Sequence, residues 1–173
     1  EEKDFDEAKQ WYDEAIRLQP NYIVAHHNLG LIYHLQEKYD KAELNYKKAI
    51  KIKPDYFSVY VNLGNTLLKQ GKIIEAKDYY DQAIKFEKKN PEAYNNLGVV
   101  LQRLGKIKEA KTAHEQALIY KNDYAEAHYN LGFCLQKLDD FDEAISAYKQ
   151  ALLIKPDYAS AESRMLDLLK HMC

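Results

Sequence analysis

The feature that most constrains this chain is the tripeptide Asn-Leu-Gly, which recurs at a fixed interval. Its four copies begin at Asn28, Asn62, Asn96 and Asn130, so each copy lies 34 residues after the one before. A fixed period without slippage indicates that one supersecondary unit is stacked several times, because a single unit cannot bury its apolar face alone. The sequence therefore predicts a repeat architecture, which favours binding through an extended surface.

A register that puts each glycine of the tripeptide at position 8 predicts complete repeats at 23–56, 57–90, 91–124 and 125–158. Alanine then occupies position 20 (Ala42, Ala76, Ala110, Ala144) and position 27 (Ala49, Ala83, Ala117, Ala151), and position 24 holds Tyr46, Tyr80, His114 and Tyr148. These spacings place the residues on one stripe of a second helix, while positions 4, 7, 8 and 11 form a stripe on a first helix. Glycine costs about 1 kcal/mol relative to alanine inside a helix, so we expect it, with the alanine at position 20, to allow close helix contact.

The two ends of the chain match incomplete repeats. Residues 1–22 fit the second helix of a repeat without its first helix, which predicts exposed apolar surface and a chain that begins inside a longer array. Residues 159–173 fit a lone first helix, in which Leu166 replaces the glycine, as expected for a capping helix.

Turn and cap residues mark the ends of the predicted helices. The turns inside the repeats are expected at Glu37, Gly71, Gly105 and Asp139. Asn90 followed by Pro91 predicts a helix that starts with an N-cap and carries proline in its first turn.

The pattern of Leu-Gly at positions 7 and 8, Ala at 20, an aromatic at 24, Ala at 27 and Pro at 32, with a period of 34, resembles the tetratricopeptide repeat. The resemblance covers essentially the whole chain. It implies an all-α, right-handed superhelical solenoid of antiparallel helix pairs, forming a single domain over 1–173. It also implies that the first helices line a concave groove that binds peptides or partner proteins. We therefore expect a protein-interaction scaffold that binds an extended, acidic or disordered segment of a partner.

The four asparagines Asn28, Asn62, Asn96 and Asn130 share position 6, on the face of the first helix opposite its buried stripe. A carboxamide offers a donor and an acceptor, which suits the backbone of an extended peptide. This row is similar to the asparagine ladder of O-linked N-acetylglucosamine transferases. The alternative is that each asparagine bonds the neighbouring repeat or faces water.

Further side chains near this row complete the predicted peptide-binding set. They are Asn65, Asn95, Tyr129 and Phe133, together with Lys69, Arg103 and Lys137 at position 13. Three cations in register favour an acidic partner segment, and two aromatic rings favour an apolar side chain. An ordinary solvated helix end is the alternative, because cations there also complement the helix dipole.

One binding mode of the resembled family is not expected. The clamp that holds the C-terminal carboxylate of a chaperone needs basic residues at positions 2, 5 and 6. Position 2 holds Val24, Ser58, Glu92 and Glu126, and position 5 holds His27, Val61, Asn95 and Tyr129.

Composition excludes several classes of function. A formal net charge of −2 argues against nucleic-acid binding, which needs a basic face. No apolar run approaches the roughly 20 residues that a membrane span needs. The two cysteines, Cys134 and Cys173, have no paired spacing, which favours the cytoplasm or another reducing intracellular compartment.

No residue pattern predicts an enzyme, a cofactor or a metal. His26 and His128 fall at position 4 and His114 at position 24, so all three are expected in the core. His27 and His34 lie seven residues apart, which is not a metal-ligand spacing. The lysine run is expected to be a solvated face of a second helix; it comprises Lys47, Lys48, Lys51 and Lys53.

Two rival functions remain beside the scaffold. The chain could be the substrate-selecting arm of an intracellular glycosyltransferase similar to the O-linked N-acetylglucosamine transferases, with the catalytic domain beyond residue 173. It could also be a self-assembling scaffold, in which an uncovered helix or the convex face stacks on another copy.

Overall fold

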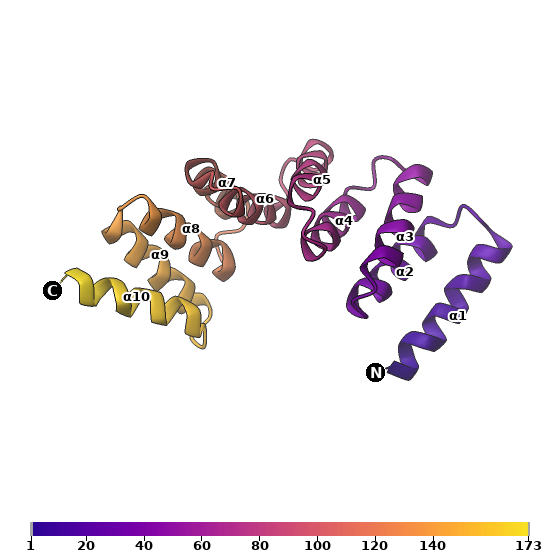
Figure 1. Ribbon diagram of the computed structural model, residues 1–173, viewed down its shortest axis with the longest axis horizontal. Helices are drawn as coiled ribbons and strands as arrows, with labels where there is room; N and C mark the ends of the chain where they lie inside the picture. The colour runs from indigo at the N-terminus through magenta and orange to yellow at the C-terminus, as the bar shows by residue number, and fades with distance from the viewer. Residues whose placement is uncertain (1, 173) are drawn as a thin grey trace. The chain divides into compact units, whose positions relative to one another are not determined.

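The computed structural model of the protein describes residues 2–172, which form α-helices joined by short turns (Figure 1). The helices of this described part are α1 (Glu2–Leu18), α2 (Ile23–Leu35), α3 (Tyr39–Ile52), α4 (Phe57–Lys69), α5 (Ile73–Phe86), α6 (Pro91–Arg103), α7 (Ile107–Tyr120), α8 (Ala125–Lys137), α9 (Phe141–Ile154) and α10 (Ala159–Met172). The predicted all-α class is confirmed. Glu1 and Cys173, where the predicted half-repeat begins and the predicted capping helix ends, lie outside the described residues.

The chain divides into two compact units, Glu1–Lys88 with α1 to α5 and Lys89–Cys173 with α6 to α10. In the first unit α2 packs on α3 and α4 on α5, while α1 contacts α2 and α3 contacts α4. In the second unit α6 packs on α7 and α8 on α9, while α7 contacts α8 and α9 contacts α10. Each 34-residue repeat thus contains one helix pair, and the expectation of a single domain over 1–173 stays a prediction.

The glycine at position 8 makes room for an aromatic ring of the second helix. A Cβ atom on Gly30 would lie 2.5 Å from Cε1 of Tyr46, and one on Gly64 would lie 2.6 Å from Cε1 of Tyr80. Both tyrosines are fully buried. The sequence indicated close contact with the alanine at position 20, whereas the group that requires the glycine is the ring at position 24.

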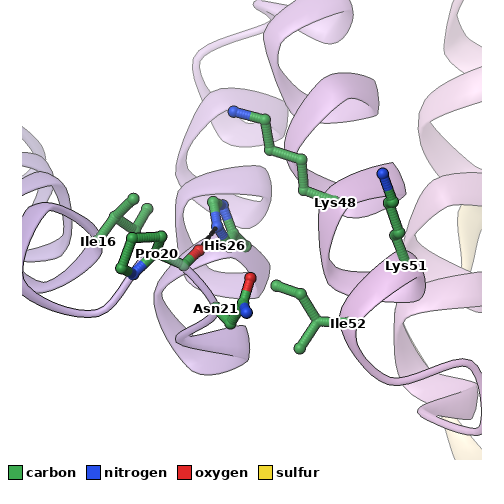
Figure 2. A pocket seen from close by; sticks show the side chains of 7 residues that line it. All are labelled: Ile16, Pro20, Asn21, His26, Lys48, Lys51 and Ile52. Atoms are coloured by element: carbon green, nitrogen blue, oxygen red, sulfur yellow. Dashed lines mark hydrogen bonds between the residues drawn. The ribbon is translucent and has the colours of Figure 1, made fainter.

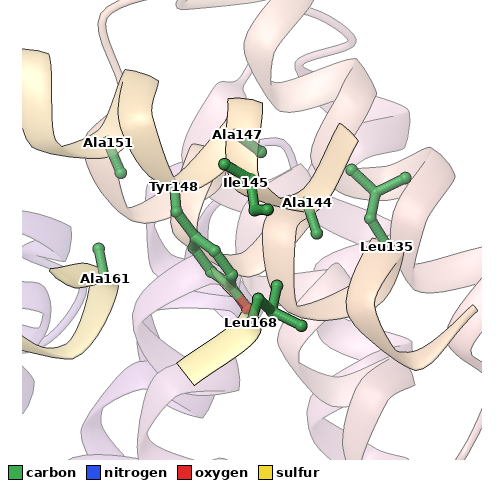
Figure 3. Packing of buried hydrophobic residues seen from close by; sticks show 8 residues of the cluster. All are labelled: Leu135, Ala144, Ile145, Ala147, Tyr148, Ala151, Ala161 and Leu168. Atoms are coloured by element: carbon green, nitrogen blue, oxygen red, sulfur yellow. The ribbon is translucent and has the colours of Figure 1, made fainter. Parts of the chain in front are cut away.

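The last repeat shows how these side chains build a core. Its buried cluster consists of Leu135, Ala144, Ile145, Ala147, Tyr148, Ala151, Ala161 and Leu168. Figure 3 shows the ring of Tyr148 extending from α9 toward Leu168 of α10. The alanines on α9 are small enough to let its neighbours approach, so α10 covers the apolar stripe of α9.

The predicted turn and cap residues adopt the backbone conformations that their positions require. Asn90 caps α6, since its side-chain oxygen accepts a hydrogen bond from the backbone N–H of Ala93 at 2.8 Å, and Pro91 is the first residue of that helix. The turns have positive φ angles at Glu37 (57°), Gly71 (78°), Gly105 (74°) and Asp139 (63°). Two of the four turns therefore hold a side chain in a left-handed conformation that favours glycine.

None of the helices in the described part of the chain is both long and apolar enough to cross a bilayer.

Candidate functional site

The side chains at positions 2, 5, 6, 9 and 13 of the first helices define what we call the first-helix face, considered within each unit separately. In the first unit, Asn28 Nδ2 donates to Tyr12 Oη at 2.9 Å and Asn62 Nδ2 donates to His27 Nε2 at 2.9 Å. In the second unit, Asn130 Nδ2 donates to Asn95 Oδ1 at 3.1 Å. One hydrogen of each of these three carboxamides therefore bonds the preceding repeat, as in the alternative drawn from the sequence.

The oxygen atoms of these carboxamides keep their accepting capacity. No residue in the described range donates a hydrogen bond to Oδ1 of Asn28, Asn62 or Asn130, and all three side chains are half-buried. Asn96, the fourth member of the row, is also half-buried. The bonded Nδ2 orients the amide plane of each of these three asparagines and so fixes the direction in which its Oδ1 can accept.

The contact with Asn62 fixes the protonation of His27. An amide nitrogen only donates, so Nε2 of His27 accepts and its proton is carried by Nδ1. Burial lowers the pKa of His27, and its ring packs against Tyr46 and Tyr56, with centroid distances of 6.1 Å and 5.4 Å. His27 therefore acts as a neutral support for Asn62.

Asn95, expected beside the row, is a link inside the second unit. Its side chain is only 5% exposed and its Oδ1 accepts from Nδ1 of His114 at 3.0 Å as well as from Asn130. Its Nδ2 lies 3.4 Å from the hydroxyl of Tyr124. These contacts leave Asn95 to position Asn130 rather than to meet a partner.

The remaining polar positions differ in their surroundings. Asn65 accepts a hydrogen bond from the hydroxyl of Tyr80 at 2.7 Å, so it lies over the buried aromatic ring of its own repeat. Lys69, Arg103 and Lys137 are exposed in the last turns of α4, α6 and α8. Each cation thus complements its helix dipole and remains accessible to a partner.

The aromatic pair of α8 holds an arginine that the sequence analysis did not select. Arg164 of α10 lies with its guanidinium carbon 4.8 Å from the centroid of the Phe133 ring. Its Nε donates to the hydroxyl of Tyr129 at 3.1 Å, and its Nη1 lies 3.4 Å from Oε1 of Gln136. Lys137 lies over the same Phe133 ring at 5.8 Å. Two cations therefore meet at one end of the predicted peptide-binding set.

A pocket of about 530 Å³ opens beside Arg164. It is lined by Tyr129, Ala159, Ser160, Ser163, Arg164 and Asp167. Arg164 follows Asn130 by 34 residues and so occupies position 6 of α10, where the other first helices carry asparagine. The register alone could have found this residue, but residues 159–173 were interpreted only as a cap.

The histidines expected in the core divide into two groups. His26 and His114 are buried, with exposed fractions of 3% and 0%. His128 is only half-buried, because Nε2 reaches out to the carbonyl oxygen of Asn122 at 2.9 Å near the surface. No cluster of three or more metal-ligating side chains occurs among the residues that the structure describes.

The helices pair in a 34-residue register, which defines a helical repeat protein. Such a protein has an extended surface that suits protein interaction, and here polar side chains lie on the first helices. Family models bear this out. A model described as TPR repeat matches residues 1–37, 32–71 and 64–105, and models described as tetratricopeptide repeat match 92–121 and 125–158. The chain belongs to the tetratricopeptide repeat family, and this membership and fold support a protein-interaction scaffold.

Solved structures of similar fold include several repeat proteins. MamA is 24% identical with a TM-score of 0.82, the match covering 92% of this chain and 93% of that one. YrrB, described as a TPR protein with an unusual peptide-binding site, is 23% identical with a TM-score of 0.78, over 94% of this chain and 84% of that one. A chain of the APC/C hetero-tetramer Cut9–Hcn1 is 22% identical with a TM-score of 0.83, over 98% of this chain and 34% of that one. A comparison with curated protein sequences gives no significant match.

Proposed function

We propose that the protein binds an extended acidic segment of a partner protein on its first-helix face. The observation that carries this proposal is the orientation of Arg164, whose guanidinium is held by Tyr129, Phe133 and Gln136 beside an open pocket. A guanidinium that is already oriented loses little conformational entropy when it binds a carboxylate.

The charges around Arg164 favour a carboxylate over a phosphate. Lys137 adds a second cation on the Phe133 ring, which strengthens the attraction for an acidic side chain. Asp167 lines the same pocket and carries a negative charge that opposes a dense dianion. A single carboxylate of aspartate or glutamate therefore suits this pocket best.

Asn130 supplies a backbone contact for the same segment. Within the second unit, Asn130 presents its Oδ1 one repeat before Arg164. Each hydrogen bond to a peptide N–H contributes only about 0.5–1.5 kcal/mol net, so affinity depends on several such contacts together. The peptide-binding description of YrrB supports this function by analogy of fold alone.

The test is capture of partner proteins from a lysate of the source cells by the full chain and by two charge variants. Arg164→Gln removes the oriented guanidinium, and Lys149→Gln removes an exposed cation of α9, a second helix that lies outside the first-helix face. Equal helicity and melting are checked first. Loss of captured proteins with Arg164→Gln but not with Lys149→Gln supports the proposal. Identical capture by both variants and the parent rules out the Arg164 pocket as the binding site.

The glycosyltransferase arm is a narrower version of the same function. Two observations support it. The four asparagines at position 6 form the ladder pattern, and the Oδ1 atoms of three of them accept no hydrogen bond from a described residue. The parent coding sequence past residue 173 tests it directly. A transferase domain there makes the bound segment a substrate, and any other continuation discards this version.

Self-assembly is supported by the exposed apolar side chains of α1, where Trp11 is 69% and Leu18 is 70% exposed. A head-to-tail arrangement that packs α1 of one copy on α10 of another is disfavoured, however. The ring at position 24, here Tyr12, needs a glycine at position 8, and α10 has Leu166 there. Sedimentation at several concentrations tests self-association, and a mass that stays monomeric excludes it.

A further inference from the structure

A cavity of about 590 Å³ lies between α1 and α3 of the first unit, on the side of the second helices. It is lined by Ile16, Pro20, Asn21, His26, Lys48, Lys51 and Ile52. Figure 2 shows Ile16 and Pro20 on one side and the α3 side chains on the other, with His26 between them. We call this space the α1–α3 cavity.

Two of the lining side chains are smaller here than their counterparts in the next repeat. The next repeat carries Tyr60 at position 4 and Phe86 at position 30, and their ring centroids lie 5.2 Å apart. The first repeat carries His26 and Ile52 at these positions. The first repeat therefore has less aromatic bulk at these two positions, as does the last repeat with His128 and Ile154.

The smaller pair preserves the backbone anchor of the larger one. Tyr60 donates its hydroxyl hydrogen to the carbonyl oxygen of Pro54 at 2.5 Å, and His26 Nε2 donates to the carbonyl oxygen of Pro20 at 3.0 Å. Both prolines occupy position 32 of the preceding repeat. The smaller side chain at position 4 therefore keeps the contact that holds the first helix to the preceding repeat.

Two lysines of α3 give the cavity its charge. Lys48 and Lys51 are exposed, and no described acidic residue forms an ion pair with either of them. The adjacent Lys47, in contrast, pairs with Glu43 at 2.6 Å. Position 26 is lysine only in this repeat; the other repeats have Gln82, Gln116 and Gln150. Among the complete repeats, only the first combines the smaller pair with a lysine at position 26.

We propose that the α1–α3 cavity is a second protein-binding site, which takes one leucine-like aliphatic side chain from a partner segment with carboxylates on either side of it. Ile16, Pro20 and Ile52 supply the apolar walls that favour burial of that side chain. The unpaired lysines select acidic flanks by charge complementarity. This site lies apart from the first-helix face, so either site can fail its test independently.

The chain itself supplies the variants that test this site. His26→Tyr with Ile52→Phe reproduces the filled pair of the next repeat, and Lys48→Gln reproduces position 26 of the other repeats. Lys85→Gln is the matched control. Lys85 occupies position 29 of the repeat at 57–90, the position that Lys51 occupies in the repeat at 23–56. Since these residues already occupy folded repeats, the variants are expected to fold.

The probe is a blocked synthetic pentapeptide with a central leucine and aspartates on both sides, titrated into the isotope-labelled full chain and followed by amide NMR shifts. We expect shifts at residues lining the α1–α3 cavity. The filled variant should bind about tenfold to a hundredfold more weakly, the factor for one lost aliphatic contact, and Lys48→Gln about twofold to fivefold more weakly. Lys85→Gln should bind as the parent does.

Two control peptides separate the contributions, one with alanine for the leucine and one with asparagines for the aspartates. Both should bind more weakly than the parent peptide. The proposal is overturned if the filled variant keeps full affinity, or if the asparagine peptide binds as tightly as the aspartate peptide. Shifts confined to the first-helix face also overturn it, and would support the proposed function instead.

Discussion

His114 donates the hydrogen on its Nδ1 to Oδ1 of Asn95 across 3.0 Å, and both side chains are buried. Its other ring nitrogen accepts a hydrogen bond from Nε2 of Gln102 at 3.2 Å. One nitrogen that donates and one that accepts require a neutral imidazole. Burial accordingly lowers the pKa of His114 to about 3.

This pKa makes the stability of the second unit sensitive to acid. The folded pKa lies below the ordinary value of 6.5, so the unfolded chain takes up the proton first. The stability that neutral His114 contributes is complete above pH 6.5 and is lost as the pH falls toward 3. We expect His114 to lower the free energy of unfolding by about 2 kcal/mol between about pH 7 and about pH 4.5.

His114→Tyr is the matched variant. In the last repeat, Tyr148 at position 24 donates a hydrogen bond to Gln136 at position 12, and His114 and Gln102 occupy the same two positions here. Denaturant titrations of both proteins at the two pH values should show a smaller acid loss in the variant. The pKa values of His27 and His34 are also lowered, so some dependence remains. An equal loss in both proteins would contradict this role of His114.

Gly64→Ala should destabilise the first unit although alanine favours helices. The added Cβ would lie 2.6 Å from Cε1 of Tyr80, a ring that has no free space. Overpacking of this kind costs about 1–3 kcal/mol, which exceeds the gain in helix propensity of about 1 kcal/mol. Thermal melts of Gly64→Ala, Tyr80→Leu and the double variant check this. If the two losses simply add, the ring is not the cause.

Glu37→Gly should stabilise the chain, because Glu37 holds a left-handed conformation with φ of 57°. Relief of that strain outweighs the entropy cost of a glycine, and the net gain is about 0.5–1 kcal/mol. Asp139→Gly should gain less, since aspartate tolerates this conformation better than glutamate. Melting temperatures order the three proteins, and a loss of stability in Glu37→Gly would refute the assignment of strain.

The sequence predicts the helix pairs of this chain well because the buried residues recur every 34 residues, once in each helix pair. The burial of Gly64 and of Tyr80 follows from spacing alone, since the residues on one stripe of a helix are set by the local sequence. The hydrogen-bond partners of the asparagines could not be predicted in the same way, because they depend on side chains one repeat away. His27 supports Asn62, whereas Asn95 supports Asn130, and both supporting residues share position 5.

The cavity and the oriented arginine escaped prediction for a different reason. The α1–α3 cavity is lined by residues of α1, α2 and α3 together, among them His26 and Ile52, and either of these two alone is an ordinary core substitution. Arg164 was visible in the register, but its use depends on contacts with Tyr129 and Phe133 that no spacing reveals. Repeat patterns thus predict the scaffold, and departures from the pattern mark its candidate sites.

Glu43 joins the two complete repeats of the first unit. Its Oε1 lies 2.6 Å from Nζ of Lys47 on the same helix, and its Oε2 lies 2.8 Å from Nζ of Lys72, which precedes α5. Burial alone would raise the pKa of this carboxyl group, but the hydrogen bonds from both lysines bring it down to about 2. Glu43 is therefore ionised over the whole range in which the protein is expected to fold.

Glu43→Gln should lower the free energy of unfolding by about 1 kcal/mol at neutral pH, since it keeps the shape and removes the charge. The folded pKa lies below the ordinary value of 4.5, so the carboxylate's contribution is complete above pH 4.5 and is lost as the pH falls to about 2. The difference between variant and parent should thus shrink in urea titrations between neutral pH and the acid end of that range. A difference that stays constant would mean that packing of the side chain, not its charge, joins the repeats.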